Sequence, residues 1–218
     1  MDLTCSPLPR ITEIVTGPQH SESLRIFCAV SLSEEARQRA AAHVARLREI
    51  APRAKISWVR PESLHLTLKF FGEIDAAMLD KIARASGRAA AGCAPFALRL
   101  NGSGNFPPRA AKSRILWLDV ADDHGRLAHL QTRLEDECVA EDFPREAQAF
   151  RPHLTLARVR VADAETRRAA VAHSESGFAP VSVPVEALAV MRSELGPGGA
   201  RYTICSLHQL KGPRQAPE

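Results

Sequence analysis

The amino-acid sequence predicts an α+β fold of two related lobes with largely antiparallel sheets, and three observations lead to it. The chain has 218 residues, of which 45% are hydrophobic and 25% charged, enough for a sizeable buried core. Strand-like and helix-like segments are mixed, without the regular strand–helix–strand alternation of a parallel sheet. The order strand, helix and histidine-bearing strand occurs twice. Because no linker separates the two halves, we expect them to form one domain.

Clear start and stop signals divide the first half of the chain. Ser33 can cap a helix, with Glu34 and Glu35 in its first turn, and Pro52 ends that segment. Asp75 can cap a second helix, which Gly92 would stop. The segment before Asp75 alternates between apolar and polar residues, as a half-buried strand does. Strands are therefore predicted at 24–31, 56–59 and 64–70, and helices at 33–50 and 75–91.

The second half follows a similar plan. Leucines 127, 130 and 134 have helical spacing, and a Gly-Pro-Gly-Gly sequence at 196–199 marks a turn between two strands. Strands are predicted at 96–103, 115–121, 153–159, 185–194 and 200–210, and helices at 123–140 and 163–173.

The ends of the chain lie outside the predicted domain. Residues 1–23 contain three prolines and a glycine without clean periodicity, so we expect a flexible N-terminal extension. This segment has no basic start followed by an apolar run, so a signal peptide is not expected. The domain is predicted to span 24–210, and 211–218 to be a C-terminal tail.

The cysteine pattern, the apolar stretches and the net charge indicate the cellular compartment and the kind of partner. The five cysteines are odd in number and scattered, with no Cys-x-x-Cys pair, so neither a disulfide framework nor a zinc ribbon is indicated. No apolar stretch reaches the roughly 18 residues of a membrane span. We therefore expect a cytoplasmic protein with no membrane partner. A net charge of +4 and a pI near 9.0 suit a polyanionic ligand.

A repeated tetrapeptide carries the chemistry. His-Leu-Thr-Leu occurs at 65–68 and again at 153–156, and chance does not explain two copies in a chain of this length. Successive side chains of a strand point to opposite faces, so His65 and Thr67 share one face while the leucines enter the core. The same holds for His153 and Thr155. We expect the two strands to present these four side chains around one cavity.

Two histidines and two threonines suit metal-independent phosphodiester cleavage. One imidazole can be neutral and the other protonated near neutral pH, so the pair can act as base and acid. The threonine hydroxyls can donate hydrogen bonds to the phosphate oxygens, where charge accumulates. Zinc normally has a third protein ligand, and neither motif contains an Asp, Glu or Cys, so no metal or cofactor is expected.

Further contacts follow from strand parity. Lys69 lies four residues after His65 and Arg151 two before His153, so both should face the cavity and neutralise phosphate charge. Ser63 occupies the corresponding place before His65. The same parity places Phe70 with the buried leucines. Four other aromatic residues are candidates for stacking on a base, although core packing is the more common role for any single one: Phe71, Phe106, Phe150 and Tyr202.

Three segments together resemble a known family. These are WVRPESLHLTLKFFGE at 58–73, ILWLDV at 115–120 and FRPHLTLARV at 150–159. They resemble the bacterial and archaeal RNA 2′,3′-cyclic phosphodiesterases, the 2′-5′ RNA ligase-like branch of the 2H phosphoesterase superfamily. The resemblance runs from about residue 24 to 210. It departs from the family pattern in the long N-terminal extension and in Leu-His-Gln-Leu at 207–210.

The resemblance implies a bilobal fold with a central cleft and hydrolysis of RNA 2′,3′-cyclic phosphate ends to 2′-phosphates. It also implies that His65 is the proton donor and His153 the proton acceptor, and it allows 2′-5′ RNA ligation as a secondary activity. We expect a monomer. Two alternatives stay open: a non-catalytic module that binds RNA ends, and a phosphodiesterase for a small cyclic nucleotide or an ADP-ribose cyclic phosphate.

Overall fold

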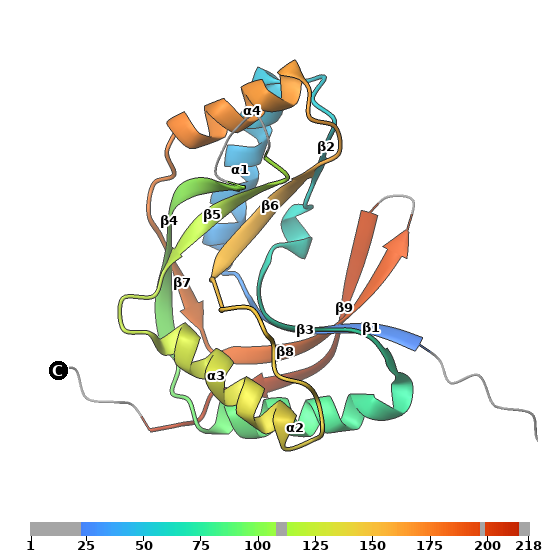
Figure 1. Ribbon diagram of the computed structural model, residues 1–218. Helices are drawn as coiled ribbons and strands as arrows, with labels where there is room; N and C mark the ends of the chain where they lie inside the picture. The colour runs from blue at the N-terminus through green and yellow to red at the C-terminus, as the bar shows by residue number, and fades with distance from the viewer. Residues whose placement is uncertain (1–22, 108–112, 197–198, 214–218) are drawn as a thin grey trace, which may run out of the picture.

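A computed structural model describes residues 23–107, 113–196 and 199–213, which form two antiparallel sheets (Figure 1). The predicted N-terminal extension lies outside the described residues except for Ser23, as does most of the predicted tail. The proposed limits of the domain therefore stay a prediction.

The first sheet has four strands in the order β3-β1-β8-β9. All neighbouring strands in it are antiparallel. Its strands are β1 (Ser23–Ser31), β3 (His65–Asp75), β8 (Ala187–Gly196) and β9 (Gly199–Gln209).

The second sheet has five strands in the order β2-β6-β5-β4-β7 and is also antiparallel throughout. Its strands are β2 (Ile56–Trp58), β4 (Phe96–Phe106), β5 (Ile115–Ala121), β6 (His153–Val159) and β7 (Val181–Val185). Each sheet thus holds one of the two histidine-bearing strands, and the predicted α+β class with two lobes is confirmed.

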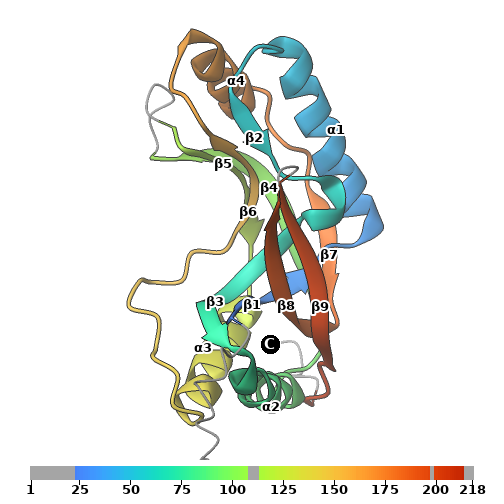
Figure 2. The same ribbon diagram turned by 90° about the vertical axis from the view of Figure 1, so that its right-hand side faces the viewer.

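Two helices cover one face of each sheet. Contacts of α2 with β8 and β9, and of α3 with β3, place this pair on the four-stranded sheet, whereas α1 and α4 pack on β7 and β4 (Figure 1 and Figure 2). The helices are α1 (Glu34–Ile50), α2 (Leu79–Ala91), α3 (Arg126–Val139) and α4 (Ala164–Glu175), with short 3-10 turns η1 (Pro61–Ser63) and η2 (Ala76–Met78). In the described part of the chain, no helix is long and apolar enough to cross a membrane.

Side-chain hydrogen bonds explain where α1, α3 and α4 begin. The Ser33 hydroxyl accepts from the Ala36 amide, as predicted, and Asp163 forms a capping box with Thr166. The third helix begins three residues later than predicted. There the Asp122 carboxylate accepts three amides of the first turn, and Gly125 precedes the helix with a φ of +62°.

The two lobes are not formed by the first and second halves of the chain in turn, because the chain crosses between the sheets. Strand β2 comes from the first half but joins the five-stranded sheet, and the C-terminal hairpin β8–β9 joins the four-stranded one. Strand β7 was not predicted. Its Pro184 lies on an edge strand, where a missing amide donor costs no ladder hydrogen bond.

The lobes share one hydrophobic core. A single cluster of buried side chains includes Leu66 and Leu188 of the four-stranded sheet together with Leu118 and Leu154 of the five-stranded sheet. Each of these four is 1% exposed or less. The two histidine-bearing strands are therefore fixed on a common, close-packed foundation.

Candidate active site

The first motif lies at the start of β3 with the predicted alternation. Leu66 and Leu68 are buried in the core, whereas His65 and Thr67 lie on the opposite face of the strand. A cleft of about 820 Å³ opens beside them. His65, Thr67 and Ser63 all line this cleft.

The second motif has the same arrangement at the start of β6. Leu154 and Leu156 are fully buried. His153 and Thr155 are partly exposed and are paired with Asp119 and Trp117 of β5. The structure therefore presents an imidazole and a hydroxyl from each of two strands.

Strands β3 and β6 contact each other although they belong to different sheets. The cleft that His65 lines is also lined by Arg158 at the far end of β6 and by Arg160 just beyond it. His153 and Thr155 are not among its lining residues. The strands are brought together as predicted, and the sharing of one reaction centre by all four side chains stays a proposal.

The two imidazoles are oriented by the same device. The Nδ1 atom of His65 lies 2.8 Å from the carbonyl oxygen of Ser63, and that of His153 lies 2.8 Å from the carbonyl oxygen of Arg151. A carbonyl only accepts, so Nδ1 carries the proton and donates it in both cases. In the neutral ring, Nε2 is then the free acceptor, and in the charged ring it is a donor. Both rings are thus ready to exchange a proton at Nε2.

Aromatic side chains hold each imidazole in place. The ring centroids of Phe27 and Tyr202 lie 4.7 and 5.0 Å from that of His65. On the other strand, Phe106 lies 5.4 Å from His153 and stacks on Trp117. Such packing restricts the rings to one rotamer and keeps their free nitrogens in a fixed direction.

Burial lowers the pKa of His65, and the hydrogen bond to the Ser63 carbonyl opposes this only in part. Burial disfavours the charged imidazolium, so the neutral form of His65 is favoured in the free protein. Within the described residues, no three His, Cys, Asp or Glu side chains gather as a metal site.

A bulge in β3 overturns two predictions that rested on strand parity. The register of β3 with β1 shifts so that Thr67 pairs with Ala29 but Lys69 pairs with Cys28, which leaves Leu68 as an extra residue. Lys69 and Phe70 therefore change face, until a second irregularity at Phe71 restores the original alternation. Lys69 was predicted to face the cavity and is buried instead, whereas Phe70 was predicted to be buried and lines the cleft at 44% exposure.

Lys69 has a structural role on the far side of the sheet. Its Nζ atom lies 2.7 Å from Oε2 of Glu135 on α3 and 2.9 Å from the carbonyl oxygen of Pro144. Both side chains of this ion pair are 4% exposed. Phe71 packs against Phe143 in the same region, so of its two expected roles, base stacking and core packing, the structure shows core packing.

The same irregularity occurs at the corresponding place in β6. Thr155 pairs with Trp117 but Ala157 pairs with Leu116, so Leu156 is the extra residue and Arg158 turns to the face of His153. Simple alternation missed Arg158. The signal for it was the pair Leu156-Ala157, in which two consecutive apolar residues interrupt the alternation.

The remaining predicted residues contribute in part. Ser63 lines the cleft and orients His65 through its carbonyl. Arg151 orients His153 in the same way, but its side chain is not among the residues that line the cleft. Among the other aromatic candidates, Tyr202 lines the cleft, Phe106 packs on His153, and Phe150 packs against the core.

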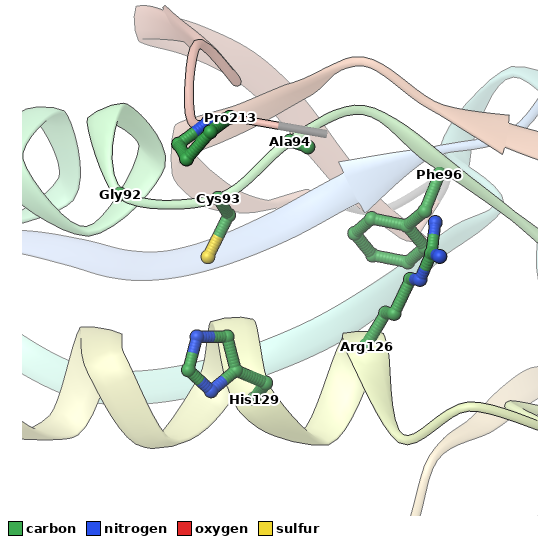
Figure 3. A pocket seen from close by; sticks show the side chains of 7 residues that line it. All are labelled: Gly92, Cys93, Ala94, Phe96, Arg126, His129 and Pro213. Atoms are coloured by element: carbon green, nitrogen blue, oxygen red, sulfur yellow. The ribbon is translucent and has the colours of Figure 1, made fainter. Parts of the chain in front are cut away.

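A second, smaller cavity of about 90 Å³ lies away from both motifs. It is formed between the C-terminal end of α2, helix α3 and the segment around Pro213, with Cys93, Arg126 and His129 around it (Figure 3). None of the predicted site residues takes part in it.

Comparison with known proteins agrees with the resemblance. A family model described as the 2′-5′ RNA ligase superfamily matches residues 36–197, which include both motifs. A Methanothermobacter thermautotrophicus protein named RNA 2′,3′-cyclic phosphodiesterase is 33% identical, over 86% of this chain and 99% of its own. A crystal structure of a Thermus thermophilus protein matches with a TM-score of 0.69 at 31% identity, covering 88% of this chain and 100% of its own. Escherichia coli LigT complexed with phosphate matches with a TM-score of 0.65 at 26% identity, covering 87% and 99%.

Proposed function

This chain belongs to the 2′-5′ RNA ligase superfamily, and we propose that it hydrolyses the 2′,3′-cyclic phosphate end of RNA to a 2′-phosphate. One observation carries the proposal. Two imidazoles on contacting strands both donate Nδ1–H to a backbone carbonyl and so keep Nε2 free for proton exchange. Acid/base catalysis of this kind needs no metal ion.

The proposed reaction uses each imidazole once. His153 removes a proton from water through Nε2, and the water oxygen attacks phosphorus. The bond between phosphorus and O3′ breaks, and His65 gives the Nε2 proton to O3′, which leaves a 3′-hydroxyl and a 2′-phosphate. Thr67 and Thr155 donate hydrogen bonds to the non-bridging oxygens while charge accumulates on them.

The lowered pKa of His65 adds a condition to its role as donor. In the free protein, burial favours its neutral form. A bound phosphodiester brings a negative charge, which raises the pKa of a nearby imidazole. Bound substrate therefore favours the protonated form of His65, which its proposed role as proton donor requires.

Two residues turned by the bulges complete the proposed site. Arg158 lies on the same face as Thr155 and lines the cleft, so its guanidinium can neutralise the reacting phosphate. Phe70 exposes a ring in the same cleft, with the Arg25 guanidinium 4.6 Å from its centroid. A base can stack on such a ring without regard to its sequence.

The proposed setting follows from the same features. In the described part of the chain, Cys28, Cys93, Cys138 and Cys205 are free thiols, which supports the reducing cytoplasm. Both histidine motifs belong to the same chain, so the proposed reaction needs no residue from a second subunit, and we propose that a monomer is active.

Phosphorus NMR of a dinucleotide with a 2′,3′-cyclic phosphate end, in excess EDTA, tests the proposal. We expect conversion to the 2′-phosphate by the wild type, and loss of conversion in His65→Ala and His153→Ala. His129→Ala is the matched control, because its imidazole lies beside the smaller cavity. Binding without conversion would favour a module that recognises RNA ends. Restoration by added zinc would replace the proposal by a metal-dependent reaction.

A further inference from the structure

The cleft extends from the first motif to a cationic end beside the last residues of β6. Beyond the bulge, Arg158 lies on the face of His153 and Thr155, and Arg160 follows it by two residues. Both arginines line the cleft. Ser57 of the neighbouring strand β2 is paired with Arg158 and also lines it, and the Arg160 guanidinium lies 3.4 Å from the Ser57 hydroxyl.

Among the described residues, neither of these two arginines forms an ion pair with a carboxylate or lies over an aromatic ring. Of the other two, Arg25 lies over the ring of Phe70, and Arg60 donates to the Ala200 carbonyl and pairs with Glu62 at 3.4 Å. None of the described residues that line the cleft is acidic. A pair of uncompensated guanidiniums inside a cleft favours an anionic ligand.

The positions of Arg158 and Arg160 along the chain indicate that they bind different groups of the ligand. A strand rises about 3.3 Å per residue, so the backbone of Arg160 lies about 7 Å beyond that of Arg158. Arg158 is the nearer of the two to Thr155 and the reacting phosphate. Arg160 is therefore better placed for a second anionic group of the same ligand than for the cyclic phosphate itself.

We propose that Arg160, together with Ser57, binds the phosphate on the 5′ side of the terminal nucleotide. The inference rests on the proposed function, because the cyclic end fixes which nucleotide is terminal. Guanidinium N–H groups and the serine hydroxyl donate to the non-bridging oxygens of that phosphate. A volume of about 820 Å³ is in the upper part of the range of about 300–1,000 Å³ for ligand pockets, so it has room for this second phosphate. The site thus selects chain ends of RNA over isolated cyclic nucleosides.

The test compares two probes that differ by one group: a nucleoside 2′,3′-cyclic phosphate with a 5′-hydroxyl, and the same compound with a 5′-phosphate. For the wild type we expect kcat/KM to be about tenfold higher with the 5′-phosphate, as one charge-assisted contact provides. In Arg160→Ala this ratio should fall to about one. The wild-type ratio should also shrink as salt is added, because the contact is electrostatic.

Arg48→Ala is the matched control. It removes the same charge from an exposed position on α1, which covers the opposite face of the five-stranded sheet. Its ratio should equal that of the wild type. The inference is overturned if Arg160→Ala keeps the tenfold ratio, or if both probes slow by the same factor.

Binding of reaction products distinguishes this inference from the proposed function. Calorimetry with a nucleoside 2′-phosphate and with the corresponding 2′,5′-bisphosphate requires no turnover. If the wild type prefers the bisphosphate and Arg160→Ala does not, the phosphate site is present even where hydrolysis is absent. Equal preference in both proteins contradicts the inference, whatever the outcome for hydrolysis.

Discussion

At the scale of single residues, the two histidines make the same hydrogen bond to the backbone but lie in different surroundings. Each donates Nδ1–H to the carbonyl two residues before it. Burial nevertheless lowers the pKa of His65. The same backbone geometry is therefore compatible with both proposed roles, and the surroundings of each ring and the bound substrate would decide which is donor and which is acceptor.

A substrate with a better leaving group separates these roles. A p-nitrophenyl phosphodiester releases a phenolate that needs no proton, so the acid becomes dispensable while the base does not. We expect His65→Ala to retain at least about a tenth of the wild-type kcat/KM on this substrate, whereas His153→Ala stays more than about a hundredfold lower. Equal losses in both variants, measured by release of p-nitrophenolate, would contradict the assignment.

The sequence predicted the four motif residues but not all of their neighbours. The repeat identified His65, Thr67, His153 and Thr155 because identical tetrapeptides impose identical alternation. It could not identify Phe70, because nothing in Leu-Lys-Phe-Phe distinguishes a regular strand from a bulged one. A bulge is a property of pairing with the neighbouring strand, which local sequence does not contain.

At the scale of secondary-structure elements, Lys69 links the first motif-bearing strand to the segment that leads into the second. It lies on β3 and holds both Glu135 of α3 and the Pro144 carbonyl. The same Glu135 oxygen accepts the amide of Glu146. These bonds fix the segment that leads from α3 into β6, so one buried ion pair joins the first motif strand to the approach to the second.

Removal of one partner of this pair should be more harmful than removal of both charges. Lys69→Met leaves the Glu135 carboxylate buried without a counter-ion, which costs about 3–5 kcal/mol in such pairs. The double variant Lys69→Met/Glu135→Gln should lose less, because no charge is left buried and the new amide oxygen still accepts from Glu146. Urea denaturation measures both, and equal losses would show that the charge of this pair has no part in stability.

Helices α1 and α4 are joined by a buried chain of imidazoles. His173 donates through Nε2 to the Trp117 carbonyl at 3.0 Å, so its Nδ1 accepts from Nε2 of His43 at 2.9 Å. The Nδ1 atom of His43 in turn faces the Arg46 guanidinium at 3.1 Å. Every ring nitrogen in this series of hydrogen bonds has a matching donor or acceptor only when both imidazoles are neutral.

Acid should therefore destabilise the five-stranded lobe. Burial, helped by His173 and Arg46, lowers the pKa of His43 from 6.5 to about 4, and burial also lowers that of His173. Because the folded pKa lies below the unfolded one, the contribution is complete above pH 6.5 and is lost as the pH falls toward 4. For His43 it amounts to about 3 kcal/mol.

Urea denaturation between pH 4 and 7 checks this expectation. His43→Gln keeps a donor for His173 but cannot titrate, so its stability should fall less steeply in this window. Glu141 and Asp163 also have lowered pKa values, but they are present in both proteins and so contribute equally to the two pH dependences. Parallel pH dependences in wild type and variant would exclude His43 as the titrating group.

At the scale of the whole molecule, the two lobes have separate sheets but do not have separate hydrophobic cores. The hydrophobic cluster runs through both sheets, and the chain crosses between them through β2 and the β8–β9 hairpin. The strand and helix positions were largely predictable, because caps and alternation are local. The crossing was not, because the choice of partner strand depends on contacts distant in sequence.

A shared core predicts a single unfolding transition. Fluorescence of Trp58 and Trp117 reports on the five-stranded sheet, and thiol labelling of the buried Cys28 reports on the four-stranded one. In wild-type protein the midpoints in urea should coincide within error. Two separate midpoints would mean that the two sheets unfold independently of each other.

The pH dependence of kcat/KM for a cyclic-phosphate-ended dinucleotide tests most directly the central claim that two histidines act as an acid and a base in one site. We expect a bell-shaped profile, because one imidazole must be charged and the other neutral. We also expect His65→Asn and His153→Asn each to abolish one limb of the bell. A rate that rises monotonically from pH 5 to 9, or a variant that keeps both limbs, would contradict this claim.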